Sequence, residues 1–205
     1  MSVLVVGMSH QSAPVALLEK LSMDDVVQHS ACGQLVDAES LTEAMIISTC
    51  NRLEVYVEAS AFHGAVHHIG HNLADITGVR LPDLSQHLYV HYEDRAVGHA
   101  FSVAAGLDSM AVGEGQILGQ FRTALRRARR SGRAGTHLGG LFDHALRVGR
   151  RRADGEHGAV DALAGQVESL GTALNDSADL RTLINSPLIS RGEQEAAIGA
   201  VASRM

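Results

Sequence analysis

The sequence predicts an α+β fold in which a small mixed or antiparallel sheet is covered by helices, with a short all-helical segment after it. Short apolar runs with strand patterns interleave with amphipathic stretches at uneven spacing, which favours a small sheet packed against helices. All the strand patterns lie within the first 90 residues, and residues 160–205 contain none. The composition, 45% apolar and 20% charged, is typical of a globular domain.

The strand patterns are short and apolar. The expected strands are residues 3–6, 44–47, 53–58 and 88–90. The first ends at Gly7, and the third alternates apolar and charged side chains, as a half-buried strand does. Between the second and third strands lies the five-residue turn 48–52.

Amphipathic spacing and terminal residues locate the helices. The expected helices are residues 13–21, 23–35, 61–76, 93–105, 116–130 and 138–151. Pro14 suits a first helical turn, and Asp24 and Asp25 suit the start of the second helix. The composition changes after about residue 157, which predicts one domain over 1–157 and a helical segment over 158–205.

The net charge of −6 argues against a general nucleic-acid binder, but it hides an arginine-rich block. Between Arg122 and Arg152 ten arginines stand against one acid, Asp143. This block could face phosphates, since arginine suits bidentate phosphate contact. The alternative is a solvated helix face in an arginine-biased proteome, because Lys20 is the only lysine.

No apolar run approaches the length of a membrane span, about 18 residues. The first residues carry no basic leader before their apolar stretch, so no secretory signal is expected. These observations predict a cytoplasmic protein.

Two cysteines are too few for a disulfide framework, so each is judged as a buried or a reactive thiol. Cys50 lies in the turn between two strands, where Thr49 and Asn51 offer donors and Arg52 brings a cation that favours a thiolate. It is a candidate nucleophile, with a small apolar residue at a strand end as the alternative. Cys32 lies within a helix and is expected to be a packed thiol.

Histidines are the other candidates. His99, beside Gly98, could direct its ring into a cleft and donate a proton, although a lone histidine is more often structural. His63, His67 and His71 share one helix face, but no acid or cysteine completes a metal shell, so no metal site is predicted. The sequence contains no Gly-x-Gly-x-x-Gly motif, so no dinucleotide-binding fold is expected.

Three segments, taken together, resemble a known family. Residues 7–14 read Gly-Met-Ser-His-Gln-Ser-Ala-Pro, and residues 48–56 read Ser-Thr-Cys-Asn-Arg-Leu-Glu-Val-Tyr. Residues 106–110 read Gly-Leu-Asp-Ser-Met, and 113–120 read Gly-Glu-Gly-Gln-Ile-Leu-Gly-Gln. In this order the segments resemble the opening, the nucleophile motif and the glutamate-recognition segment of glutamyl-tRNA reductases, over about 155 residues.

The resemblance implies a reaction and a set of site residues. The Cys50 thiolate would attack the ester that joins glutamate to its tRNA, and NADPH would reduce the thioester to glutamate-1-semialdehyde, an early intermediate of tetrapyrrole synthesis. His99 would assist acyl transfer, and Arg52 would pair with the side-chain carboxylate of the glutamyl group. The implied substrate-binding residues are Thr49, Asn51, Arg52, Ser109, Glu114, Gly115, Gln116 and Gln120, with Gly115 where the family often has proline.

After Arg152 the sequence departs from the family. The nucleotide-binding and dimerisation domains expected of a homodimeric reductase are not encoded in this chain, so full reduction is not expected. Residues 163–204 instead resemble part of the N-terminal domain of the ATP synthase delta subunit. The alternative hypotheses are therefore a non-catalytic interaction protein that uses this tail and, more remotely, a metal-binding regulator that uses the His63–His71 face.

Overall fold

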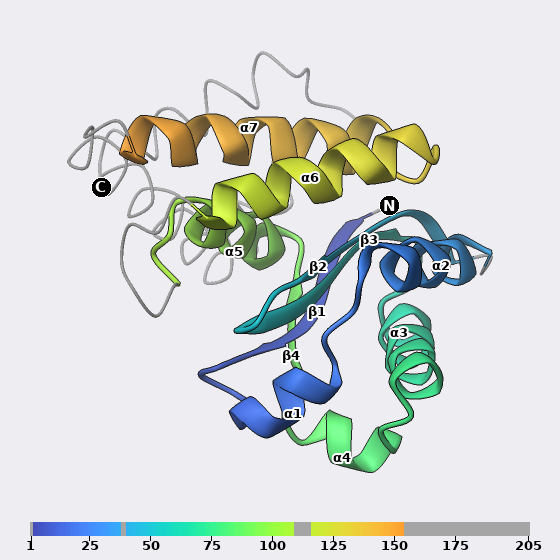
Figure 1. Ribbon diagram of the computed structural model, residues 1–205. Helices are drawn as coiled ribbons and strands as arrows, with labels where there is room; N and C mark the ends of the chain where they lie inside the picture. The colour runs from blue at the N-terminus through green and yellow to red at the C-terminus, as the bar shows by residue number, and fades with distance from the viewer. Residues whose placement is uncertain (1, 38–39, 109–115, 154–205) are drawn as a thin grey trace, which may run out of the picture.

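The computed structural model describes residues 2–37, 40–108 and 116–153, which form an antiparallel sheet covered by helices on both faces (Figure 1). The strands are β1 (Ser2–Ser9), β2 (Leu41–Ser48), β3 (Arg52–Ala59) and β4 (Tyr89–Tyr92). Their order across the sheet is β2-β3-β1-β4, and each neighbouring pair is antiparallel. The predicted α+β fold is confirmed, with an antiparallel rather than a mixed sheet.

Two groups of helices cover the two faces. The helices are α1 (Val15–Lys20), α2 (Asp25–Val36), α3 (Phe62–Thr77), α4 (Leu81–Ser85), α5 (Asp94–Ala104), α6 (Gln116–Arg130) and α7 (Thr136–Ala153). Helices α1 to α4 pack on one face, and α5, α6 and α7 pack on the other (Figure 1). Each face therefore has its own apolar core, which period-two alternation along the strands supplies.

Strand β3 shows how both faces are filled. Leu53 and Val55 belong to the core under α2 and α3, while Tyr56 belongs to the core under α5 to α7. The expectation that this strand is half-buried was wrong, because every residue from Arg52 to Ala59 is buried. The charged residues on its second face are covered by helices, so their charges need partners inside the protein.

Gly7 lies within β1, which continues to Ser9 rather than ending at the glycine. In the sheet Gly7 is opposite Glu54 of β3 on one side and Tyr89 of β4 on the other. A Cβ atom on Gly7 would lie 2.9 Å from Glu54 Cγ and 2.9 Å from the Leu53 carbonyl oxygen. The missing side chain thus leaves space in which a side chain from β4 can reach one from β3.

Most expected elements are confirmed with shifted ends, and the short helix α4 was not predicted. Asp24 caps α2, its Oδ1 accepting the amides of Val26 and Val27 at 2.9 and 2.8 Å. The helical segment expected over 158–205 lies outside the described residues, so that domain division stays a prediction. Among the described helices, none has the length and apolar character needed to cross a membrane.

Candidate functional site

Cys50 lies in a tight turn, Thr49 to Asn51, that is fixed on both sides. Thr49 Oγ1 accepts the amides of Asn51 and Arg52, each at 3.1 Å, and the Thr49 amide donates to the Arg52 carbonyl at 2.9 Å. On the other side, the amide of His10 donates to the Asn51 carbonyl at 2.9 Å. Cys50 itself is exposed, as predicted. The turn therefore presents the thiol to solvent on a backbone with few ways to move.

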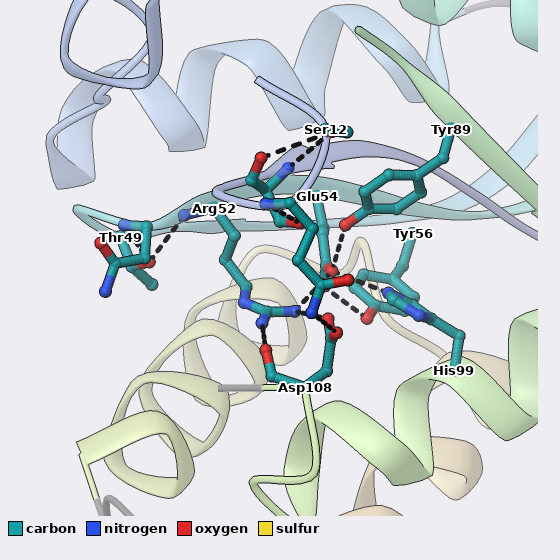
Figure 2. A network of polar contacts seen from close by, with 11 residues as sticks. Ser12, Thr49, Arg52, Glu54, Tyr56, Tyr89, His99 and Asp108 are labelled. Carbon is teal, nitrogen blue, oxygen red and sulfur yellow. Dashed lines mark hydrogen bonds and ion pairs between the residues drawn. The ribbon is translucent and has the colours of Figure 1, made fainter. Parts of the chain in front are cut away.

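A buried carboxylate, Glu54, lies at the centre of a polar network that reaches the turn through Arg52 (Figure 2). Its Oε1 accepts from Arg52 Nη1 at 2.9 Å, from the Tyr89 hydroxyl at 2.6 Å and bonds His99 Nε2 at 2.7 Å. Its Oε2 accepts from the Tyr56 hydroxyl at 2.7 Å. Glu54 is completely buried, so these partners take the place of water.

The charge of Glu54 is retained despite its burial. Burial alone would raise its pKa, but the hydrogen bond and charge of His99 and the charge of Arg52 lower the pKa to about 2. Burial, together with the charge of Glu54, raises the pKa of both Tyr56 and Tyr89. At neutral pH the network is therefore an ionised carboxylate held by protonated hydroxyls and a guanidinium.

The guanidinium of Arg52 has a second carboxylate partner. Its Nη1 lies 3.0 Å from Asp108 Oδ2, and its Nη2 donates to the Asp108 carbonyl. Gln11 Nε2 donates to Asp108 Oδ1 at 2.8 Å. Burial would lower the pKa of Arg52, but Glu54 and Asp108 raise it, so the cation is permanent. A carboxylate arriving from solvent would have to replace Asp108 to pair with it.

His99 extends from α5 into the same network. Its ring stacks on His91, with centroids 4.4 Å apart, and meets Tyr89 edge-on at 5.4 Å. Burial and the charge of His99 lower the pKa of His91. Because Nε2 of His99 is bound to Glu54, Nδ1 is the ring nitrogen outside that bond. Glu54 therefore fixes the plane of the ring.

The structure brings together only some of the predicted substrate-binding residues. Thr49, Asn51 and Arg52 lie in or beside the Cys50 turn. Gln120, on α6, lines a cavity of about 480 Å³ that Ser48 also lines. Ser109, Glu114 and Gly115 lie outside the described residues, and Gln116 is placed only as the first residue of α6.

The possible metal ligands already have structural partners. In the Glu54–His99–Asp108 cluster both carboxylates are engaged, Glu54 by Arg52 and two tyrosine hydroxyls and Asp108 by Arg52 and Gln11. In a second cluster, Glu43 accepts the amides of His137 and Leu138 at the start of α7, and His137 Nδ1 lies 2.6 Å from Glu58 Oε1. These contacts fit helix capping and an ion pair.

The histidines of α3 and the second cysteine are outside the site. His67 and His71 approach with their Nε2 atoms 3.1 Å apart, but within the described ranges no third ligand is grouped with them. Cys32 is buried, as predicted, and burial raises its pKa to about 11. It is therefore a packed thiol.

Sequence reasoning missed four members of the network: Glu54, Tyr56, Tyr89 and Asp108. Glu54 and Tyr56 alternate with Arg52 on one face of β3, a period-two pattern that could have identified them. Tyr89 and Asp108 carry no such local signal, because β4 and the loop after α5 reach the site only through the fold. His10 was also missed; its Nδ1 is buried and has no hydrogen-bond partner among the described residues.

Comparisons with known proteins agree on one family. Residues 6–154 match the family model described as "Glutamyl-tRNAGlu reductase, N-terminal domain". A glutamyl-tRNA reductase of Corynebacterium aurimucosum is 58% identical over 151 residues, which cover 74% of this chain and 33% of that protein. One of Frankia casuarinae is 49% identical over 174 residues, covering 85% of this chain and 36% of that protein.

A solved structure shows the same fold. The glutamyl-tRNA reductase from Methanopyrus kandleri superimposes with a TM-score of 0.59 at 30% identity, covering 74% of this chain and 34% of that one. The chain thus spans about a third of the length of the curated relatives that it matches.

Proposed function

Because this chain belongs to the family of glutamyl-tRNA reductase N-terminal domains, we propose that it catalyses the acyl-transfer half of that reaction. The Cys50 thiol would take the glutamyl group from glutamyl-tRNA and hold it as a thioester. The observation that carries the proposal is the exposed Cys50 in a turn fixed by Thr49 and His10, directly before the buried ion pair of Arg52 and Glu54. A nucleophile held in this way loses little freedom when it reacts.

The chemistry balances with groups that the chain supplies. The Cys50 sulfur forms a bond to the ester carbonyl carbon, and the bond from that carbon to the ribose oxygen breaks. The ribose oxygen leaves with the proton that the thiol gives up, and His99 is proposed to carry that proton. Thr49 Oγ1 accepts two backbone amides, so its own hydroxyl proton remains available to donate to the substrate.

Substrate recognition is proposed to centre on Arg52. A glutamyl side-chain carboxylate has the same chemistry as the Asp108 carboxylate that Arg52 now holds. Exchange of one carboxylate for the other would keep the guanidinium paired. Asn51 and Gln120 are proposed as further polar contacts, and so are Ser109, Glu114, Gly115 and Gln116, which the three motifs imply.

The proposal stops at the thioester. In the reductases, NADPH would supply the hydride that releases the acyl group as an aldehyde. The sequence has no glycine-rich nucleotide motif, and the described sheet is antiparallel rather than the parallel sheet of a dinucleotide fold. No step is therefore assigned to NADPH within the described residues, and when no hydride is supplied we expect water to hydrolyse the thioester slowly.

Intact-protein mass spectrometry tests this proposal. The full chain is mixed with glutamyl-tRNA, the reaction is quenched in acid, and the mass of the protein is measured. We expect the added mass of one glutamyl group. Cys50→Ala should remove the adduct, whereas Cys32→Ala, a matched loss of one thiol, should retain it. An unmodified wild-type protein, or an adduct that survives in Cys50→Ala, would contradict the proposal.

A further inference from the structure

A groove runs between α2 and α6 on the side of the molecule next to the Cys50 turn. At one end is the cavity of about 480 Å³, lined by Ser48, Gln120 and Thr123 among others. At the other end is a second cavity of about 390 Å³. Its lining residues are Asp25, His29, Thr123, Arg126, Arg127, Arg130 and Ser131. The two cavities share Asp25, Thr123 and Arg127, so they are parts of one groove.

The second cavity carries unpaired positive charge. Arg127 is engaged, because it bonds Gln28 Oε1 at 2.9 Å and pairs with Asp25. Within the described part of the chain, Arg130 has no hydrogen bond or ion pair, and Arg126 bonds only Thr123 Oγ1, at 3.4 Å. Both side chains are exposed. Within the described residues, two guanidiniums without an acidic partner therefore line a cavity whose single acid, Asp25, is already paired.

Arginines near the end of a helix also stabilise it through the helix dipole. That role explains why Arg129 and Arg130 suit the last turn of α6. Arg129 is the matched case: it ion-pairs with Asp143 at 2.6 Å and is absent from the groove. The dipole does not require that Arg126 and Arg130 share a cavity with His29 and Ser131, so the cavity calls for a separate explanation.

The groove is continuous with the proposed acyl site. Ser48 lies two residues before Cys50, and its Oγ accepts the amide of Met23 at 3.0 Å, which ties the start of α2 to the end of β2. From Gln120 to Arg130 the helix rises about 15 Å, and Arg126 and Arg130 are about 6 Å apart along its axis. A chain with regularly spaced anions could therefore follow α6 away from the thiol.

We propose that this groove binds the single-stranded 3′ end of the tRNA, with Arg126 and Arg130 on its phosphates while the glutamyl ester lies at Cys50. This inference rests on the proposed function, since that function places an RNA 3′ end at the thiol. Cavities of this size hold a small-molecule-sized group rather than a duplex. No phenylalanine, tyrosine or tryptophan lines either cavity, so the contact is with the backbone and is independent of sequence.

Binding of unacylated tRNA to the full chain tests the groove. In Arg126→Gln/Arg130→Gln we expect affinity at low salt to fall about 10- to 100-fold, and the salt slope to fall by about 1.4, which is 0.7 for each lost contact with a single strand. The control, Arg80→Gln/Arg147→Gln, removes the same charge from exposed positions outside the groove. It should bind nearly as the wild type does.

A tRNA that lacks its single-stranded 3′ end locates the contact. With this RNA the wild type and the Arg126/Arg130 variant should bind equally. An undiminished difference with the shortened RNA, or an equal loss in the control variant, would overturn the inference.

Cys50 acylation separates this inference from the proposed function. With a small glutamyl thioester as donor, the Arg126/Arg130 variant should acylate at the wild-type rate, but with glutamyl-tRNA about 10-fold or more slowly at subsaturating concentration. If Cys50 accepts no acyl group while tRNA binding still depends on the two arginines, the function fails and the groove stands. Equal acylation rates with glutamyl-tRNA would overturn the groove alone.

Discussion

Cys32 and Cys50 place the same side chain in two different environments, one buried and one exposed. Cys32 is within α2, 7% exposed, in the apolar core between that helix and the sheet. Cys50 is exposed in the turn between β2 and β3. The first thiol is enclosed by apolar packing, whereas the second lies in a turn that leads directly into Arg52, a member of the buried network of charges and hydroxyl groups.

The difference shows how the fold presents a reactive group. Apolar packing around Cys32 raises its pKa and removes it from chemistry. The turn that carries Cys50 is held from its C-terminal side, because Arg52 follows it and the Arg52 guanidinium is held by Glu54 and Asp108. The charges fix the strand end without covering the thiol. An apolar cluster in the same place would have to enclose the sulfur to hold the turn.

The largest expected effect is a difference between the alkylation rates of Cys50 and Cys32. At pH 7.5 iodoacetamide should modify Cys50 at least about a hundredfold faster than Cys32, because a pKa of about 11 leaves Cys32 with little thiolate and packing blocks access. Peptide mapping by mass spectrometry gives both rates from one sample. Similar rates at the two cysteines, in protein shown to be folded, would remove the contrast.

The acid dependence of stability tests the polar network around Glu54. The pKa of Glu54 is lowered from 4.5 to about 2, so its contribution is complete above about pH 4.5 and is lost as the pH falls towards 2. The loss is on the order of 3 kcal/mol. Urea unfolding from pH 6 to pH 2.5 should show this loss in the wild type.

Glu54→Gln isolates that contribution. The variant should be less stable at pH 6, because Arg52 and His99 lose their anion, and its stability should change less between pH 4.5 and pH 2.5. Wild-type and variant curves that run parallel through this range would show that Glu54 does not titrate in this way.

Local patterns predicted much of the fold and the turn at the site. Apolar runs identified the strands, and the segment Thr49–Arg52 carries its chemistry in adjacent residues. Glu54 was misread because a charged residue in an alternating strand normally faces water. Here α5 to α7 cover that face, and no pattern within β3 reports a helix about 40 residues further along the chain.

The remainder of the site depends on the order of the strands. Tyr89 reaches Glu54 because β1 lies between β3 and β4, with Gly7 in the same row as both residues. The sequence contains the glycine and the tyrosine, but the register that aligns them is a property of the assembled sheet. Asp108 reaches Arg52 in a similar way, from the loop after α5.

Gly7→Ala tests whether the contact between Tyr89 and Glu54 requires a residue without a side chain between them. The new Cβ would collide with Glu54 Cγ and the Leu53 carbonyl oxygen, so we expect a loss of about 1–3 kcal/mol in unfolding free energy and slower acylation of Cys50. Gly64→Ala is the matched control, since a Cβ there would meet no atom within 4 Å apart from its chain neighbours and the adjacent backbone of α3. It should stabilise the protein slightly. Equal effects of the two substitutions would show that the gap at Gly7 has no role.

Asp108→Asn should have the smallest effect on stability and the most specific effect on binding. Arg52 keeps the buried Glu54 as its anion, and an amide oxygen at position 108 can still accept from Arg52, so loss of the Asp108 charge should cost about 1 kcal/mol. If a substrate carboxylate replaces Asp108 on Arg52, the weaker competitor should lower the KM for a small glutamyl thioester about 3- to 10-fold. That factor corresponds to about 0.7–1.4 kcal/mol.

Gln11→Ala, which removes the 2.8 Å bond to Asp108 without changing its charge, should lower the KM less. A raised KM in Asp108→Asn would mean instead that the aspartate holds Arg52 in its working position, and that the carboxylate of the substrate binds elsewhere.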